Sequence, residues 1–297
     1  MFENIKLAFQ GIWGHKMRSL LTMLGIIIGI GSIISIVSTI KGTNEQIKQN
    51  LIGSGTNAVT IKLYNGDWEY ELEYEGIPQG VRPLSEAVRS QLAAIDKVED
   101  VSLFYSRSYN NSTYYGNTQF SGGLYGIDKH YLNVNGYQVS LGRGFSDKDY
   151  SQFKKVCLVD EDAMQAIGIE GSPIGQVIEI SKEPFVIIGL VTLSAGYEPV
   201  INNMNDYYTY TGSSNGKVFI PDVHWPMVYQ YDEPQAVCLK TESTDDMTAA
   251  GKAATELVNS TLPPNLEANG AKITYKSNDL TEQALQQPSV SVPASSL

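Results

Sequence analysis

The strongest constraint on this chain is an uncharged run of 22 residues, SLLTMLGIIIGIGSIISIVSTI, at positions 19–40. As an α-helix this run is about 33 Å long, enough to cross the ~30 Å hydrocarbon core of a bilayer. Lys16 and Arg18 lie directly before it, and basic residues favour the cytoplasmic side of a membrane span. The sequence therefore predicts a transmembrane helix over residues 19–40, with the N-terminus in the cytoplasm and residues 41–297 outside.

A cleaved signal peptide is the alternative interpretation of the apolar run. Signal peptides have a shorter apolar region, of about 7–15 residues, followed by a cleavage site made of small residues. Val37-Ser38-Thr39 is a poor site of that kind. We therefore favour a membrane anchor that stays attached to the protein.

The residues before the run also have a helical pattern. Apolar side chains recur at every third or fourth position from Phe2 to Trp13, with polar residues between them. This spacing predicts an amphipathic helix over residues 1–18 that lies on the cytoplasmic membrane surface, with Trp13 at the level of the headgroups. A disordered leader is the alternative.

Inside the run, Gly25 and Gly29 form a G-x-x-x-G pair, and Ser32 lies close to the same face of the helix. Small residues at this spacing let two membrane helices approach closely. These three positions are the candidate site residues of the chain, and we expect them to pack against a partner helix. Glycine is also common in membrane helices without such a role, which is the alternative explanation.

The rest of the sequence lacks the motifs of the common catalytic and metal-binding sites. The net charge is −11 at neutral pH, which argues against a nucleic-acid partner because phosphate binding requires clustered Lys and Arg. The sequence contains no P-loop, HExxH or G-x-S-x-G motif. His15, His130 and His224 are isolated from one another. We expect no catalytic residue, no metal and no cofactor.

The two cysteines do not form a disulfide framework. Cys157 and Cys238 each lie inside an apolar, strand-like run, KKVCLVD and QAVCLKT. Two buried free thiols are the favoured interpretation, since a free cysteine behaves as a small apolar residue. A single bridge between the two runs is the alternative, because an extracytoplasmic compartment would permit it.

The pattern beyond the anchor predicts an α+β fold. A strand at 59–63, a helix from an N-cap at Ser85 to Ala94 and a strand at 98–105 form one unit. A strand at 236–240, a helix at 244–257 capped by Thr244 and a strand at 272–276 form a second. Between the two units we expect a solvated hairpin or loop at 105–120, a long loop at 193–216 and strands at 122–127, 156–160, 177–181, 184–192 and 217–220.

These units predict a two-part extracytoplasmic domain over residues 41–285, after the N-terminal transmembrane helix. The flanking strand–helix–strand pieces, 41–104 and 236–285, would pair into one split subdomain. The β-rich stretch 105–235 would be inserted between them as a second subdomain. The remaining residues, 286–297, are predicted to form a flexible tail.

Several local patterns together resemble a family of transporter subunits. They are KMRSLLTMLGIIIGIGSIISI at the anchor, GTNAVTI at 55–61, Gly126-Ile127-Asp128 with Tyr131, Gly142-Arg143-Gly144-Phe145-Ser146, VCLVDEDAMQAIG at 156–168, Pro173-Ile174-Gly175, FVIIGLV at 185–191 and VFIP at 218–221. In this order and at these intervals, over roughly residues 15–280, the chain resembles the permeases of MacB-like and FtsX-type ABC transporters.

The resemblance implies a permease subunit in the inner or plasma membrane with an extracytoplasmic core of two subdomains. It implies a separate ABC-type ATPase subunit, a second permease subunit in a dimer and the lipid bilayer as partners, and no particular substrate. It also implies that the domain transmits ATP-driven movement, so that its functional site is an interface and not a catalytic pocket.

The sequence departs from the family pattern in one respect. Permeases of this family carry three further membrane helices after the domain, whereas no apolar run of about 20 residues follows Ile40 here. We therefore expect a truncated or derived single-span form that does not couple to an ATPase alone. A stand-alone, membrane-anchored binding module is the alternative function.

Overall fold

The computed structural model describes residues 16–52, 57–108, 110–194, 215–268 and 270–278. The chain divides into two units, Met1–Lys48 and Gln49–Leu297, and each is described by itself. Three of the predicted segments lie outside the described residues: the surface helix before Lys16, most of the loop at 193–216 and the C-terminal tail.

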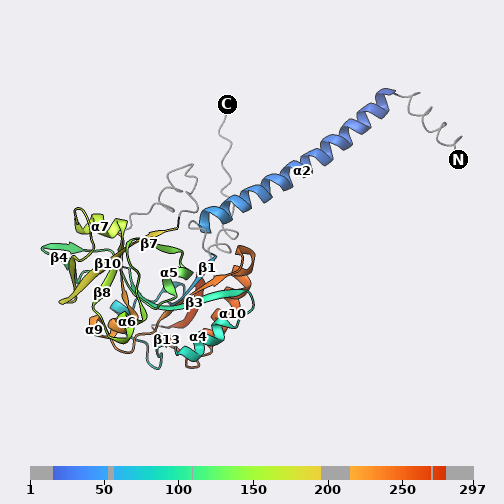
Figure 1. Cartoon of the computed structure of the whole chain (residues 1–297). Coiled ribbons are helices and arrows are strands. Elements are labelled where there is room, and N and C mark those ends of the chain that lie inside the picture. The colour runs from blue at the N-terminus through green and yellow to red at the C-terminus, as the bar shows by residue number, and fades with distance from the viewer. Residues whose placement is uncertain (1–15, 53–56, 109, 195–214, 269, 279–297) are drawn as a thin grey trace. The chain divides into compact units, whose positions relative to one another are not determined.

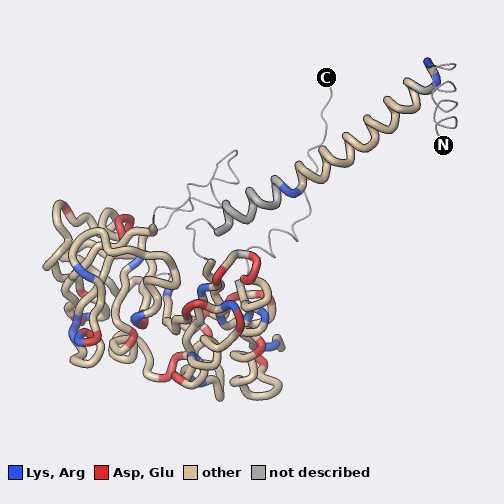
Figure 2. Tube along the Cα trace, turned by 45° about the vertical axis from the view of Figure 1, so that its right-hand side comes forward, with Lys and Arg blue, Asp and Glu red and all other residues tan. Residues whose placement is uncertain are grey.

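The N-terminal unit contains most of one long helix, α2 (Lys16–Ile52, 37 residues), whose last four residues belong to the second unit (Figure 1). Its segment Lys16–Lys41 is long and apolar enough to cross a membrane, and the large apolar side chains described there are exposed. No charged residue lies between Arg18 and Lys41 (Figure 2). An exposed apolar stripe of this length is stable in lipid and not in water. The predicted N-terminal membrane helix is confirmed, in the sense that the structure has a helix there that is long and apolar enough to span a bilayer.

The second unit is built on a 14-stranded sheet with the order β13-β14-β1-β12-β3-β6-β11-β8-β10-β9-β4-β5, in which β2 also pairs with β1 and β7 with β10. The strands are β1 (Ala58–Asn65), β2 (Trp68–Glu69), β3 (Val98–Arg107), β4 (Thr113–Tyr115), β5 (Thr118–Phe120), β6 (Gly123–Ile127), β7 (Tyr137–Gly142), β8 (Val156–Asp160), β9 (Val177–Ile180), β10 (Glu183–Leu193), β11 (Lys217–Pro221), β12 (Ala236–Thr241), β13 (Glu267–Ala268) and β14 (Ala271–Asn278). The sheet and its helices confirm the predicted mixed α and β fold.

Short helices connect these strands and cover them. They are α3 (Leu72–Glu75), α4 (Glu86–Ala93), α5 (Tyr131–Val134), α6 (Asp147–Ser151), α7 (Glu161–Ile167), α9 (Trp225–Val228) and α10 (Met247–Asn259), with 3-10 turns at Asp222–His224 and Thr244–Asp246. The predicted cap of α4 is confirmed, because the Ser85 side chain accepts a hydrogen bond from the Val88 N–H. The cap predicted at Thr244 is wrong. Residues 244–246 form a 3-10 turn, so α10 begins later and Asp246 occupies its N-cap.

The strand β3 joins the two halves of the sheet. Its residues 98–104 pair with β12, and its residues 104–107 pair with β6. The pairing partner therefore changes at Phe104, where the strand passes from one half of the sheet into the other. The sheet is continuous at the predicted junction between the two subdomains, while the subdomain boundaries themselves stay a prediction.

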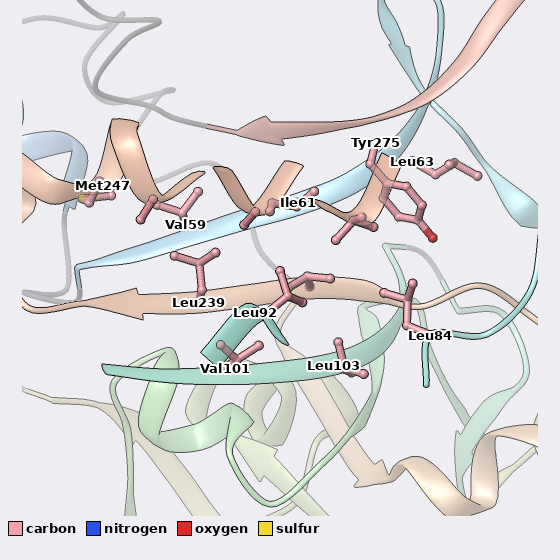
Figure 3. Packing of buried hydrophobic residues seen from close by; sticks show 14 of the residues in the cluster. Val59, Ile61, Leu63, Leu84, Leu92, Val101, Leu103, Leu239, Met247 and Tyr275 are labelled. Atoms are coloured by element: carbon pink, nitrogen blue, oxygen red, sulfur yellow. The ribbon is translucent and has the colours of Figure 1, made fainter. Parts of the chain in front are cut away.

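One hydrophobic core lies on the half of the sheet that contains β14, β1, β12 and β3. Its side chains come from these strands, from α4 and α10, and from Tyr70 and Leu84 in the connecting segments (Figure 3). Val59 and Ile61 alternate with partly exposed residues along β1, because successive side chains of a strand point to opposite faces. The small Gly251 lets α10 lie close to this strand, since an added Cβ there would be 3.0 Å from Val59.

Of two further cores, one lies on the other half of the sheet, and the other includes side chains from both halves, from β12 to β10. Cys157 on β8 belongs to one of them and Cys238 on β12 to the other, and both thiols are free and buried. Three strands separate β8 from β12, which corresponds to about 19 Å at the normal strand spacing. A disulfide requires Cα atoms within about 7 Å. Of the two interpretations, the free thiols are therefore correct.

The motif Gly142-Arg143-Gly144-Phe145-Ser146 forms a tight structural clamp before α6. Gly142 has a φ of +79°, and a Cβ there would lie 2.3 Å from the Ile188 carbonyl oxygen. Arg143 donates to both oxygens of the buried Asp149 carboxylate, at 2.6 and 3.1 Å. The N–H and hydroxyl of Ser146 donate to the same carboxylate. These hydrogen bonds, led by that from Arg143, hold the pKa of Asp149 well below its usual range.

We predict that Arg143→Ala lowers the free energy of unfolding by about 2 kcal/mol at neutral pH, because it leaves a buried carboxylate with fewer donors. A group with a depressed pKa stabilises the fold above its unfolded pKa, about 3.9 for Asp, and loses this effect as the pH falls below it. The difference between the variant and the parent should therefore shrink on acidification. Urea denaturation in a non-ionic detergent, followed by tryptophan fluorescence, measures it.

The matched control is Arg89→Ala. Arg89 makes an ion pair with the exposed Glu86 on the surface of α4, and removing such a pair should cost less than about 1 kcal/mol. Equal losses in the two arginine variants would contradict a stabilising role for the buried carboxylate.

Candidate functional site

The predicted site residues Gly25, Gly29 and Ser32 all lie in α2. Their spacing of four and three residues places them on one side of the helix. A Cβ added at Gly25 or Gly29 would meet no atom of the described residues within 4 Å, so both positions leave room there for a neighbouring helix. Their packing against a partner helix stays a prediction.

A second candidate site lies where β3 pairs with β6, and its residues come from three separated segments. We call it the junction cluster, and it consists of Tyr105, Arg107, Trp225, Tyr229 and Glu233. The two β3 side chains lie next to Trp225 and Tyr229 at the two ends of α9. Glu233 lies in the segment that leads into β12.

The junction cluster is held by a buried ion pair. Arg107 donates to one oxygen of Glu233, and the side chains are only 8% and 3% exposed. The indole N–H of Trp225 donates to the other oxygen of Glu233 at 2.6 Å. Both carboxylate oxygens therefore have charged or polar donors, as a buried carboxylate requires.

Aromatic rings close over this ion pair. Tyr105 stacks on Trp225 with ring centroids 5.2 Å apart and planes 8° apart. The Arg107 guanidinium lies 4.6 Å from the Tyr229 ring centroid and 5.5 Å from that of Trp225. Cation–π contacts of this kind are stronger where water is excluded. The cluster thus fixes the end of β3 against α9 and the approach to β12.

A pair of carboxyl groups lies near the same junction. Asp128, from the Gly126-Ile127-Asp128 motif, accepts hydrogen bonds from the Ser102 hydroxyl and the Leu103 N–H of β3. Burial, together with the negative charge of Asp128, raises the pKa of Asp222 to about 7. Through its hydrogen bonds to Ser102 and Leu103, Asp128 holds the end of β6 against β3. Its role in the described structure is to orient the backbone.

Sequence reasoning did not find the junction cluster. Arg107 and Glu233 are 126 positions apart, and neither belongs to a motif with a known spacing. The only signal was the run of tyrosines that begins at Tyr105. Among the residues that the structure describes, no group of three or more His, Cys, Asp or Glu side chains could hold a metal ion.

Residues 19–257 match the MacB-like periplasmic core domain. The chain belongs to this family. It is 30% identical over 288 residues to the ABC transporter permease YvrN of Bacillus subtilis, and 29% identical over 259 residues to the permease YknZ of the same organism. It is 34% identical over 193 residues to the macrolide export ATP-binding/permease protein MacB of Aggregatibacter actinomycetemcomitans.

The fold matches a solved structure of the same family. The periplasmic region of MacB from Actinobacillus actinomycetemcomitans superposes with a TM-score of 0.54 at 23% identity, covering 82% of this chain and 98% of that one. The MacB-like resemblance seen in the sequence motifs is therefore confirmed. The chain covers 67% of the length of YvrN, 61% of that of YknZ and 29% of that of MacB. The matches to these three relatives include 96%, 87% and 65% of this chain, in the same order.

We predict that Arg107→Ala lowers the free energy of unfolding by about 3–5 kcal/mol, because it leaves the Glu233 charge buried without a partner. Glu233→Gln should also be costly, because its one amide oxygen can accept from only one of Trp225 and Arg107 and the guanidinium charge stays buried without a counter-charge. Denaturation monitored by tryptophan fluorescence and by far-UV circular dichroism measures both variants.

Lys97→Ala is the control for this prediction. Lys97 pairs with Glu242 at 2.9 Å, and both side chains are about half exposed. Its loss should cost no more than about 1 kcal/mol. An Arg107→Ala variant as stable as this control would show that the buried pair does not hold the junction.

We predict that Gly25→Ile combined with Gly29→Ile weakens self-association of the chain in detergent, because the larger side chains keep the helices apart. Analytical ultracentrifugation or cross-linking in micelles measures the change. Gly31→Ile is the matched control, since it lies on a different side of the helix. Association that is unchanged in the double variant would exclude this packing face.

Proposed function

We propose that this chain acts as a permease subunit of a MacB-type ABC transporter, whose extracytoplasmic domain transmits ATP-driven movement to a substrate or partner. Membership of the MacB-like family and the similarity to ABC transporter permeases support a permease role. The transport step, its coupling to ATP hydrolysis and the direction of movement go beyond these similarities and are our proposal.

The observation that carries this proposal is the continuity of the sheet. Only residues 53–57 separate the end of α2 from β1 in the sequence. β1 is hydrogen-bonded to β12, β12 to β3, and β3 to β6. Rigid elements joined by hydrogen bonds move as a body. A displacement of β1 would therefore be passed across the domain through β3.

The chain's own residues fit a mechanical role and not a catalytic one. The buried carboxylate of Asp149 and the partly buried ones of Asp128 and Asp160 all accept hydrogen bonds from backbone N–H groups, so each has a structural task. ATP hydrolysis would accordingly reside in a separate ATPase subunit. We place the N-terminus in the cytoplasm and residues 41–297 outside, with a second permease subunit across the Gly25 face.

An insertion test distinguishes transmission from simple anchoring. In the ATPase–permease complex in nanodiscs, spin labels at Glu170→Cys on two permease copies should report an ATP-dependent change in distance. The native thiols Cys157 and Cys238 are buried, so they do not compete for the label. About eight Gly and Ser residues inserted after Ser54 should abolish the distance change while ATP hydrolysis continues, because a flexible linker transmits little force.

The same insertion between Gly116 and Asn117, in the turn of the β4–β5 hairpin, is the control and should leave the distance change intact. An ATP-dependent distance change that survives the linker after Ser54 would contradict mechanical transmission. A distance that does not respond to ATP, in a complex that hydrolyses ATP, would favour the anchored binding module.

A further inference from the structure

The 3-10 turn at Asp222–His224, which we call the 222–224 turn, joins β11 to α9 and carries two titratable side chains. It ends directly before Trp225, the fully buried tryptophan of the junction cluster. The Trp225 N–H donates to the Asp222 carbonyl oxygen. The 222–224 turn therefore sets the position of the indole ring against the end of β3.

The first titratable group of the turn, Asp222, lies next to another carboxylate. β6 and β11 are parallel, with Ile127 opposite Pro221, so Asp128 and Asp222 follow the two strands at the same level. Their backbones are therefore about 5 Å apart, the normal spacing of neighbouring strands. Asp128 accepts hydrogen bonds from the Ser102 hydroxyl and from three backbone N–H groups. Such donors favour the charged form of Asp128.

The Asp222 carboxyl group has fewer donors. Among the described residues it makes no ion pair, and the donors near it are backbone N–H groups of its own turn. Its other titratable neighbours are Tyr105 of β3 and Tyr150 of α6, whose pKa values are raised by burial and by the charge of Asp222. Two close carboxylates do not both ionise easily. Asp222 therefore keeps its proton up to a pKa of about 7, to which burial and the charge of Asp128 raise it.

The second titratable group of the turn, His224, is buried among aromatic rings. Its residue is 3% exposed, and neither ring nitrogen has a partner with hydrogen-bond geometry in the described structure. The ring lies edge-on to Phe153 and Phe185, with centroids 6.3 and 5.6 Å away. The nearby charge is that of Lys155, which is paired with Glu183. Burial lowers the pKa of His224, the Lys155 charge adds to this, and backbone groups near the ring offset it only in part.

We propose that the 222–224 turn closes with Asp222 and His224 both uncharged, and that the two groups oppose each other in setting how its closure depends on pH. When the turn opens, Asp222 releases one proton to water and His224 takes one up, so the two exchanges cancel. This keeps Trp225 in place over a wider range of pH than either group alone would allow. The inference concerns the domain alone and does not depend on coupling to an ATPase.

The opposition follows from the sign of each effect. A carboxyl group whose pKa is raised in the fold destabilises it increasingly as the pH rises from its unfolded pKa, about 3.9, to its folded pKa, here about 7. A histidine whose pKa is lowered in the fold destabilises it as the pH falls below its unfolded pKa, about 6.5. Both effects operate just below pH 6.5, in opposite directions. Removing either group should therefore reveal the effect of the other.

Hydrogen exchange of the full chain in a non-ionic detergent measures the opening of the turn. Mass spectrometry follows the peptide that contains residues 222–229. Its reporters are the Trp225 N–H and the Tyr229 N–H, which donates to the Trp225 carbonyl oxygen at 2.9 Å. Protection factors, corrected for the intrinsic pH dependence of exchange, are compared at pH 5.0 and pH 6.5.

The two single variants should respond to pH in opposite directions. Asp222→Asn should lose protection at least about twofold from pH 6.5 to pH 5.0, because only His224 then exchanges a proton on opening. His224→Phe should lose protection at least about fivefold from pH 5.0 to pH 6.5, because only Asp222 then exchanges one. The parent should lie between the two variants, and the double variant should not depend on pH.

Asp147→Asn is the matched control, because Asp147 is an exposed carboxylate of α6, the helix that carries Tyr150. It should reproduce the pH dependence of the parent. A variant that only weakens the turn lowers protection equally at both pH values, so the comparison separates titration from a loss of packing. Changes of the same sign in the two single variants, or a double variant that keeps the parent's pH dependence, would overturn the proposal.

Discussion

The whole domain depends on the shared pairing of a single strand. β3 has β12 along its first seven residues and β6 along its last four, with Phe104 common to both. Without it the sheet would separate into two smaller sheets with two exposed edges. The Arg107–Glu233 pair lies at the end of this strand, where the hydrogen-bonded ladder has a neighbour on one side only. The two charges, whose burial is costly, therefore lie where strand pairing gives the β3 backbone fewer hydrogen bonds.

The apolar side chains of the membrane helix and those of the domain are kept from water in different ways. The apolar side chains described between Lys16 and Lys41 of α2 are exposed, whereas those of β1, β8 and β12 are buried by other parts of the same chain. The helix therefore acquires its stability from lipid and the domain acquires it from its own cores. The match to the MacB-like family includes both parts, since it begins inside the helix, at residue 19, and ends in α10, at residue 257.

Local features of the fold were predictable from the sequence, and long-range ones were not. The strand at 156–160 and the cap at Ser85 follow from apolar runs and capping chemistry, and the structure has both. The start of α10 was misplaced because Thr244, Asp245 and Asp246 are all suitable caps. The pairing of β3 with β6 leaves no sequence pattern. For the same reason the junction cluster was missed, while the Gly25 and Gly29 pair could be recognised from its local spacing alone.

The position of β1 has a consequence for the order of folding. Its two long neighbours, β12 and β14, come from the last quarter of the described chain, and Lys62 is paired in register with Lys276. Contacts between such distant residues form late and slow the folding of a domain. During synthesis, the apolar face of β1 stays uncovered until β14 has been made. The core around β1 therefore closes late, and the growing chain must avoid aggregation for most of the time that its synthesis takes.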